Sequence, residues 1–284
     1  MRMGAALLPI LGLIGTAMAE EPRYHPPVGW IATYRFLSTA HIGAKETTLG
    51  HVYRLTTTQS SDTGSEATVT ILAMLFGCPE RETGRLCSQA RDFPGATRDG
   101  DIITVPVPPE IAADLAKIGK VSGRDFVRVT QEFPILGAEN MDEIAKPKIG
   151  AAPLYIQTTK IACDDAAIKP FFPLGAAATL SVPCKMTNAR SQSRWAPVTN
   201  TSTTDDVTID LSFAGRDRIR VAAGDFDVAS VKYKITPAAP TGSSYEGDWQ
   251  VIETTGSTAR ATSLVHFPDS DTTRAIREMI KSGS

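Results

Sequence analysis

The sequence predicts a mainly β protein whose antiparallel, curved sheets form a partial barrel or a sandwich-like pair, with one or two short covering helices. Short apolar runs recur along the 284 residues, and Gly, Pro, Ser, Thr and Asp separate them. From Val207 to Phe213 every second residue is apolar, which is the period of a half-buried strand. Helical spacing of apolar residues, by contrast, is found in two segments only.

In the first part of the chain, five segments predict strands. Residues 29–37 (GWIATYRFL) and 51–57 are rich in aromatic and β-branched residues, which favour strands. Residues 66–76 are more continuously apolar and predict a strand that is buried on both faces. Residues 125–133 and 154–162 complete this set.

Beyond residue 200 the predicted strands follow one another closely. They comprise residues 207–213, 218–222, 226–235, 248–254 and 259–267. Between them lie the turn-forming sequences AGRD (214–217), AGD (223–225) and PAAPTG (237–242), in which Gly, Pro and Asp favour tight turns. This order predicts a series of antiparallel hairpins.

Two segments predict short helices that cover a sheet. Residues 109–119 open on Pro-Glu and end on a glycine, with apolar residues at helical spacing between them. Residues 271–281 follow an Asp-Ser-Asp sequence that offers capping oxygens, and they place Ile276, Met279 and Ile280 on one helical face.

The first 19 residues have the layout of a secretory signal peptide. Arg2 precedes an apolar run from Ala5 to Ile14, and the small residues Ala17 and Ala19 frame a cleavage site. We therefore expect cleavage after Ala19 and a mature protein that is periplasmic or secreted. No later apolar stretch approaches the roughly 20 residues that a membrane-spanning helix needs, so no transmembrane segment is expected in the mature chain.

Residues 143–153 (EIAKPKIGAAP) form the best internal boundary, because they contain two prolines and show no periodicity. This boundary divides the chain into three parts. They are the signal peptide at 1–19, a β-rich domain at 20–145 that contains the first helix, and a C-terminal β domain at 153–284 that contains the second.

Charge and composition are those of an ordinary globular protein. The formal net charge is −2 and 42% of the residues are hydrophobic, so nothing in the composition requires a disordered chain. The nearest approach to a basic run is formed by Arg216, Arg218 and Arg220, whose alternation fits the solvated face of a strand. A nucleic-acid partner would require a clustered basic surface, so none is expected.

The four cysteines, Cys78, Cys87, Cys163 and Cys184, predict two structural disulfides, because an even count in an exported chain favours pairing. Three pairings are open, and we prefer the nearest-neighbour one, Cys78–Cys87 and Cys163–Cys184. Each loop of this size stabilises a fold by roughly 2–4 kcal/mol. Zinc sites usually need closely spaced Cys or His pairs, redox sites usually need Cys-x-x-Cys, and neither spacing occurs.

Motifs for catalysis, metals and cofactors are missing from the sequence. His25, His41, His51 and His266 show no pairing at helical or close strand spacing, so no metal site is expected. The chain has no Gly-x-Ser-x-Gly motif and no glycine-rich phosphate loop. We therefore assign no catalytic residue, expect no cofactor, and favour a role other than that of an enzyme.

A further pattern runs through the second half. Residues 172–175 (FPLG) precede a strand, residues 221–226 (VAAGDF) turn into another, and Trp249 comes before Gly256. Over residues 171–267 this order resembles a family of bacterial envelope proteins of unknown function, whose β domain carries a Pro-Leu-x-x-Gly opening, a Val-x-Ala-Gly-x-Phe turn and a Trp before a late Gly. The resemblance implies a strongly curved antiparallel sheet in the periplasm and no agreed catalytic residues. The family often has a Tyr or Pro near the Trp, where this chain has QVIE.

The candidate ligand-binding residues are Trp30, Tyr34, Tyr53 and Trp249, because aromatic side chains can line a pocket inside a curved sheet. The alternative for each is a simple place in the core. The expected function is that of a non-catalytic binding or envelope-associated module, with an apolar ligand, a glycolipid or an envelope protein as partner.

Two other functions stay open. A hydrolase that acts on an envelope polymer would hold two carboxylates with separated protonation states in a cleft. A structural subunit of an envelope assembly would show a long exposed edge strand or a large apolar surface patch.

Overall fold

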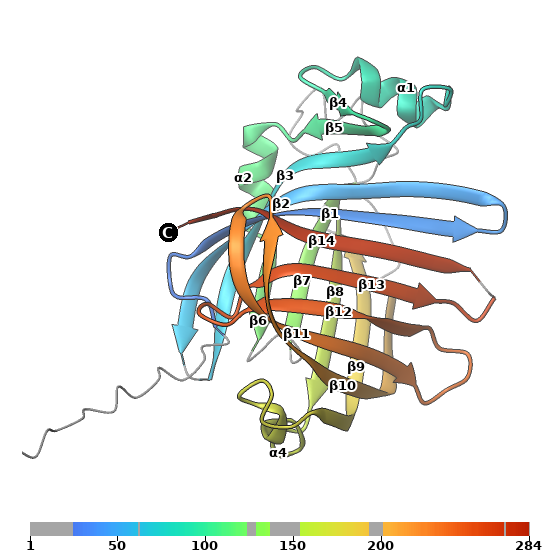
Figure 1. Ribbon diagram of the computed structural model, residues 1–284. Helices are drawn as coiled ribbons and strands as arrows, with labels where there is room; N and C mark the ends of the chain where they lie inside the picture. Colours follow the sequence, from blue (N-terminus) through green and yellow to red (C-terminus); the bar gives the residue numbers. More distant parts are fainter. Residues whose placement is uncertain are drawn as a thin grey trace, which may run out of the picture.

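A computed structural model describes residues 25–61, 63–123, 129–136, 154–192, 201–269 and 271–283 (Figure 1). The predicted signal peptide, its predicted cleavage site and the predicted domain boundary at 143–153 lie outside the described residues. The strands are β1 Ile31–Ile42, β2 Lys45–Ser61, β3 Gly64–Gly77, β4 Thr97–Asp99, β5 Ile102–Pro106, β6 Lys120–Gly123, β7 Val129–Leu136, β8 Leu154–Cys163, β9 Thr179–Gln192, β10 Thr201–Val221, β11 Gly224–Pro237, β12 Ser244–Ile252, β13 Thr258–His266 and β14 Thr272–Gly283. The helices are α1 Arg85–Asp92, α2 Pro109–Ala116 and α4 Asp165–Ile168, and a 3-10 turn, η2, follows at Lys169–Phe171.

The strands form one antiparallel sheet that closes on itself. From β6 to β14 each strand pairs with the next, β14 pairs with β1, and β1 pairs with β2. The pairings of β3 with β2 and with β6 complete the ring. The short strands β5 and β4 extend from β3 outside it. The prediction of a mainly β fold is thus confirmed, and the sheet forms a closed barrel rather than a partial barrel or a sandwich.

The helices lie at the edges of this barrel. Figure 1 shows α1, β4 and β5 beyond β3 at the top of the view and α4 on the opposite side. Helix α2 lies within the first segment that has helical periodicity, and it packs against β3. Three short helices are therefore present in the described residues, where the sequence predicts one or two.

The predicted helix at residues 271–281 is wrong, because these residues form β14, which hydrogen-bonds to both β13 and β1. Within this strand Met279 is fully buried, whereas Ile276 points outward and is 42% exposed. The spacing of Ile276, Met279 and Ile280 fits a helix, but the strand satisfies backbone groups on both edges and closes the barrel. Tertiary pairing overrides the local preference.

A second correction concerns residues 214–217, which are predicted to turn. Strand β10 instead runs through them, with a β-bulge between Phe213 and Gly215, where Gly215 has φ +124°. A bulge bends a strand without ending its pairing. As a result β10 contributes Leu211 to one core cluster and Val221 to the other.

The core consists of two clusters of buried side chains. One lies among β1, β2, β3 and the first two helices, and it also contains Val228 from β11 and Met279 from β14. The other lies among β9 to β12 and includes Ile168 and Phe171 from α4 and η2. The first cluster therefore joins strands from both predicted domains, and the division into two domains stays a prediction.

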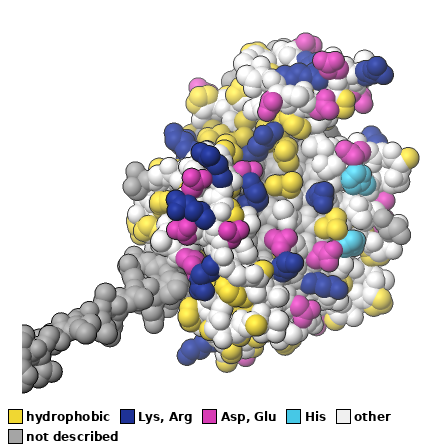
Figure 2. Space-filling model, in the orientation of Figure 1, with side chains coloured by type: hydrophobic (Ala, Val, Ile, Leu, Met, Phe, Trp, Pro, Cys, Tyr) yellow, Lys and Arg dark blue, Asp and Glu magenta, His cyan; other side chains and the backbone are white. Residues whose placement is uncertain are grey.

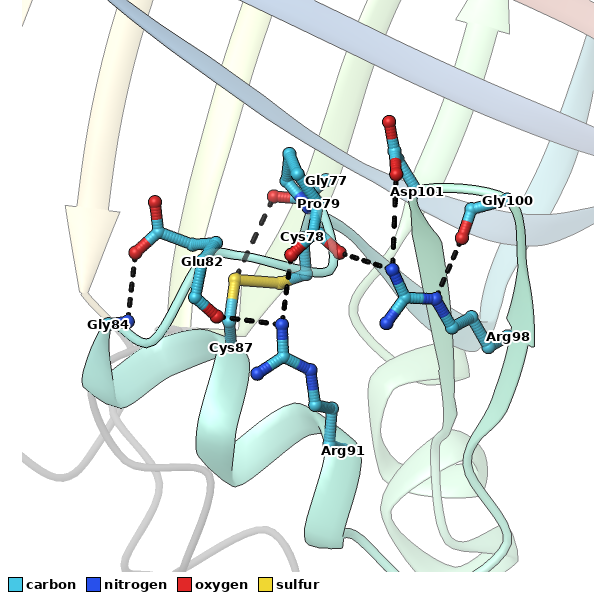
Figure 3. Close-up of a disulfide and its surroundings, with 10 residues drawn as sticks. All are labelled: Gly77, Cys78, Pro79, Glu82, Gly84, Cys87, Arg91, Arg98, Gly100 and Asp101. Atoms are coloured by element: carbon cyan, nitrogen blue, oxygen red, sulfur yellow. Dashed lines mark hydrogen bonds and ion pairs between the residues drawn. A yellow bond between two sulfur atoms is a disulfide. The ribbon is translucent and has the colours of Figure 1, made fainter.

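Both disulfides follow the preferred nearest-neighbour pairing. Cys163 in β8 bonds to Cys184, its directly opposite residue in β9. Cys78 at the end of β3 bonds to Cys87 in α1, and Figure 3 shows how the surrounding loop is held. Arg91 donates hydrogen bonds to the carbonyl oxygens of Pro79 (3.0 Å) and Glu82 (2.7 Å).

Candidate functional site

Four ring side chains form a row on the core-facing side of β1 and β2, which we call the aromatic row: Tyr34, Tyr53, His51 and Phe36. The register places Tyr34 opposite Tyr53 and Phe36 opposite His51. Ring centroids lie 5.3 Å apart for Tyr34 and Tyr53, 5.0 Å for Phe36 and His51, and 5.5 Å for His51 and Tyr53. Tyr34 and Tyr53 are only 3% and 4% exposed. Two stacked pairs, joined by the tilted contact between His51 and Tyr53, thus form one continuous aromatic surface.

A cavity lies on each side of the aromatic row. The first, which we call the Arg277 cavity, has a volume of about 120 Å³ and is lined by Trp30, Tyr34 and Arg277, among others. The second, the His51 cavity, has a volume of about 160 Å³ and is lined by Phe36 and His51 with apolar residues of β3. The row therefore separates a cavity that contains a charge from a mostly apolar one.

Arg277 comes from β14 and lies opposite Phe36 of β1. Its guanidinium donates a hydrogen bond to Thr258 Oγ1 (3.0 Å), stands 5.6 Å from the centre of the Tyr34 ring, and hydrogen-bonds to Tyr53. Among the described residues it forms no ion pair with a carboxylate. Neutral hydroxyls and a ring face thus surround a full positive charge.

Arg277 stays protonated in this position. Burial alone would lower the pKa of its guanidinium, but the neighbouring Tyr53 and Tyr34 outweigh burial, so that the pKa rises. Burial also raises the pKa of both tyrosines, which are therefore neutral at ordinary pH. The side chain of Arg277 is half-buried, because protein surrounds most of it and the rest faces the cavity.

Three hydrogen-bond donors of the Arg277 cavity have no acceptor among the described residues. They are the Nε of Arg277, the indole Nε1 of Trp30 and the hydroxyl of Ser257, and all three atoms are buried. Leaving such a group without a partner costs about 1–3 kcal/mol, and native proteins leave few of them. The backbone of Trp30 is fixed, since its carbonyl accepts from Thr57 N (2.9 Å).

A polar depression adjoins the Arg277 cavity at the β2–β3 hairpin. It has a volume of about 450 Å³, and Ser65 and Gly123 border both hollows. Its other lining residues are mostly hydroxyl-bearing or amide side chains: Gln59, Ser60, Ser61, Thr63 and Ser122. The wall therefore changes from apolar beside the aromatic row to hydroxyl-rich at the hairpin.

The His51 cavity contains a histidine without charge. Burial lowers the pKa of His51 to about 4. The ring stacks on Phe36 and lies tilted against Tyr53, so the neutral imidazole packs here like an aromatic side chain.

Three of the four candidate ligand-binding residues come together in the structure. Trp30 and Tyr34 line the Arg277 cavity, and Tyr53 stacks on Tyr34 in the aromatic row. Trp249 instead stacks on Tyr233 at 4.2 Å and packs against the second core cluster. Sequence reasoning missed Arg277, because it assigned that residue to a helix.

A fourth hollow lies between β2, β3, β6 and β7. It has a volume of about 280 Å³ and contains the carboxylates Glu66 and Glu132 on either side of Lys120. Lys120 lies directly opposite Glu132, and Glu66 and Lys120 are exposed. Charged side chains in such exposed positions contribute little to stability. These residues form the solvated face of the strands.

Other features of the surface are ordinary. Figure 2 shows Lys and Arg side chains mixed with Asp and Glu on the visible face, without a basic cluster. Within the described ranges, no three His, Cys, Asp or Glu side chains are grouped closely enough to hold a metal ion. Membrane-spanning length and hydrophobicity are not reached by any helix in the part of the chain that the structure describes.

No protein-family model and no curated protein matches the chain. Among solved structures, the crystal structure of a "putative exported protein with YmcC-like fold" from Bacteroides fragilis aligns with it. The alignment covers 93% of this chain and 100% of that chain, with 9% sequence identity and a TM-score of 0.33.

Proposed function

We propose that this chain is an exported, non-catalytic binding protein that holds a small amphiphilic molecule in the Arg277 cavity. The signal-peptide pattern of residues 1–19 supports export. So do the two disulfides, because structural disulfides persist in oxidising compartments and are rare in the cytoplasm.

The observation that carries the proposal is an unfilled space with donors inside a closed barrel. The interior of a small barrel is normally filled by side chains, and a ligand can enter only where strand number and curvature leave room. Here the space is bordered by Tyr34, Leu55 and Val121 on its apolar side and by Arg277 and Ser257 on its polar side. Ligand pockets combine an apolar wall with a few polar groups in this way.

The size of the cavity limits what enters it. A buried cavity of about 150 Å³ accommodates benzene, so the Arg277 cavity, at about 120 Å³, encloses roughly five non-hydrogen atoms. Any further part of the ligand would extend to the polar depression, where Ser61, Ser65 and Ser122 offer hydroxyl groups. Sugar hydroxyls bind well to such groups, which keeps a glycolipid fragment within the proposed class.

The binding function is favoured over the two alternatives by what each would require. The described lining of the Arg277 and His51 cavities contains no Asp or Glu, whereas a polymer hydrolase needs a carboxylate pair in its cleft. A structural subunit needs a long free edge. Among the described strands, the free edge of the sheet is β4, Thr97–Asp99, which is only three residues long.

We also propose membership of the envelope-protein family that residues 171–267 resemble. One glycine of the pattern supports it. Gly224 has φ +133°, and few residues other than glycine adopt such a backbone angle readily. Gly224 begins β11 directly after the two-residue turn that follows Val221, which explains a glycine in the Val-x-Ala-Gly-x-Phe turn.

The test measures binding of the neutral probe 1-hexanol by NMR titration. Two leucine variants serve as a matched pair: Ala32→Leu fills the Arg277 cavity, and Ser38→Leu fills the His51 cavity. We expect saturable binding to the wild-type protein, a loss of about tenfold or more in Ala32→Leu, and unchanged binding in Ser38→Leu. Absence of saturable binding, or equal binding by wild type and Ala32→Leu, would show that the proposal is wrong.

A further inference from the structure

We propose that the ligand of the Arg277 cavity is a monocarboxylate, with its carboxylate bound by Arg277 and its apolar body against the aromatic row. This inference rests on the proposed function and adds the chemical class of the ligand.

The first argument is charge. Arg277 is half-buried, and a guanidinium that faces a small cavity instead of bulk water loses part of its solvation, which is costly for an unpaired charge. Arg277 is surrounded by Tyr34, Tyr53 and Thr258, none of which is charged at ordinary pH. The hydroxyls and the ring face compensate only part of the guanidinium charge. An anion in the cavity would compensate the rest.

The unpaired polar groups of the cavity are all able to donate hydrogen bonds. Arg277 Nε, Trp30 Nε1 and Ser257 Oγ are all able to donate, and none has an acceptor among the described residues. An ionised carboxylate accepts only, with about four lone-pair sites on two oxygens. A carboxylate therefore brings enough acceptor sites for these donors and no donor of its own, whereas an alcohol or an amide would bring donors into a site that needs acceptors.

The third argument is that the site is held in place before any ligand binds. Strand β14 is paired on both sides, with Arg277 opposite Phe36 on β1 and Ala261 on β13. The hydrogen bond to Thr258 and the Tyr34 ring fix the plane of the guanidinium. A charge-assisted contact from a fixed guanidinium keeps more of its strength, because little side-chain freedom is lost on binding.

The volume of the cavity and the apolar residues that line the rest of it favour a ligand with a short apolar part. Leu55, Val121 and Ala32 line the cavity beside the aromatic row. Together with the small volume, they fit a carboxylate with a short apolar chain, whose end extends past the cavity towards the polar depression. Hexanoate is the probe that matches both features.

The experiment compares hexanoate with hexanamide, its neutral and nearly isosteric analogue, by isothermal titration calorimetry at pH 7. In the wild-type protein we expect hexanoate to bind at least about tenfold more tightly, as a hydrogen-bonded charge pair requires. Arg277→Gln should abolish this preference. Arg274→Gln, which removes an exposed arginine from the same strand, should leave it unchanged.

Two conservative variants keep the test decisive if Arg277→Gln fails to fold. Trp30→Phe retains the ring but removes the indole donor, and Ser257→Ala removes the hydroxyl. Each should reduce the preference for hexanoate over hexanamide about threefold or more while hexanamide binding stays the same. A melting curve for each variant establishes that it is folded.

The outcomes separate the two proposals. If 1-hexanol binds in the Arg277 cavity but hexanoate binds no more tightly than hexanamide, the carboxylate inference is overturned and the proposed function stands. If neither 1-hexanol nor hexanoate binds, both are overturned. A preference for hexanoate that persists unchanged in Arg277→Gln would also overturn the inference, because the anion would then be bound elsewhere.

Discussion

Acidification should destabilise this protein through His51 in particular. Burial lowers the pKa of that imidazole from 6.5 to about 4 in the folded state, whereas the unfolded chain keeps the ordinary value. Between pH 6.5 and 4 the unfolded chain therefore binds a proton that the folded protein does not bind. The free energy of unfolding should fall as pH drops through this window and should lose no more through His51 below it.

The magnitude follows from the width of that window. At about 1.4 kcal/mol per pH unit, a pKa lowered from 6.5 to about 4 corresponds to about 3 kcal/mol. Because the ring borders the His51 cavity and is only half-buried, some hydration of the charged form persists, and about 2–3 kcal/mol is the expected loss.

The assay is urea unfolding followed by tryptophan fluorescence between pH 7.5 and 4, applied to the wild type and to His51→Phe. Phenylalanine preserves the stacking against Phe36 and Tyr53 and removes the titrating group. The wild-type stability should therefore fall about 2–3 kcal/mol further than that of the variant. The control is His41→Phe, at a residue whose side chain is 50% exposed. Between pH 7.5 and 4 this variant should lose the same unfolding free energy as the wild type to within about 1 kcal/mol. Parallel pH curves for wild type and His51→Phe would refute the reasoning.

Three further predictions concern the fold. Replacing both Cys163 and Cys184 by alanine opens a loop of sequence separation 21 and should lower the free energy of unfolding by about 3 kcal/mol, or the melting temperature by about 6 °C; an unchanged calorimetric melting temperature contradicts this. Met279→Ala should cost about 2–5 kcal/mol because the side chain is fully buried, whereas Ile276→Ala on the exposed side of β14 should cost less than about 1 kcal/mol in the same urea assay. Equal costs would fit the helical arrangement, in which both residues share a face. Gly175→Ala should cost about 1–3 kcal/mol, because φ is +92° and an aromatic carbon lies 3.1 Å from the position of the new Cβ; thermal unfolding at the wild-type temperature would contradict it.

The strands that the sequence predicts well are those with one face in the core. Alternation from Val207 to Phe213 and the continuous apolar run of residues 66–76 both follow directly from burial, which depends on side-chain chemistry alone. Strand β9 shows where this reasoning fails. Val182, Cys184 and Met186 alternate as buried residues, but Pro183 lies between them and argues against a strand. The pairing of β9 with β8 ends at Cys184, so Pro183 lies where β9 has no partner on that side and the missing backbone N–H removes no hydrogen bond to β8.

The closure of the barrel is not encoded in any local pattern. It depends on the pairing of β1 with β14, whose residues are separated by most of the chain. The periodicity of β14 fits a helix as well as a strand, and only the two neighbouring strands decide between them. A local sequence pattern describes one segment only. The backbone hydrogen bonds that a distant strand supplies to this segment leave no trace in the pattern.

The candidate site depends on the same closure. Tyr34 and Trp30 are predicted as ligand-binding residues because aromatic side chains can line a pocket in a curved sheet. Arg277 is not predicted, because an arginine in an amphipathic helix is expected on the solvated face. Once residues 272–283 form a strand, alternation places Arg277 on the same side as Met279, which is fully buried. The pairing that buries Met279 opposite Tyr34 also brings the guanidinium beside the Tyr34 ring. The charge inside the barrel is therefore a direct consequence of the strand that closes it, and a variant that weakens the β1–β14 pairing should reduce stability and carboxylate binding together.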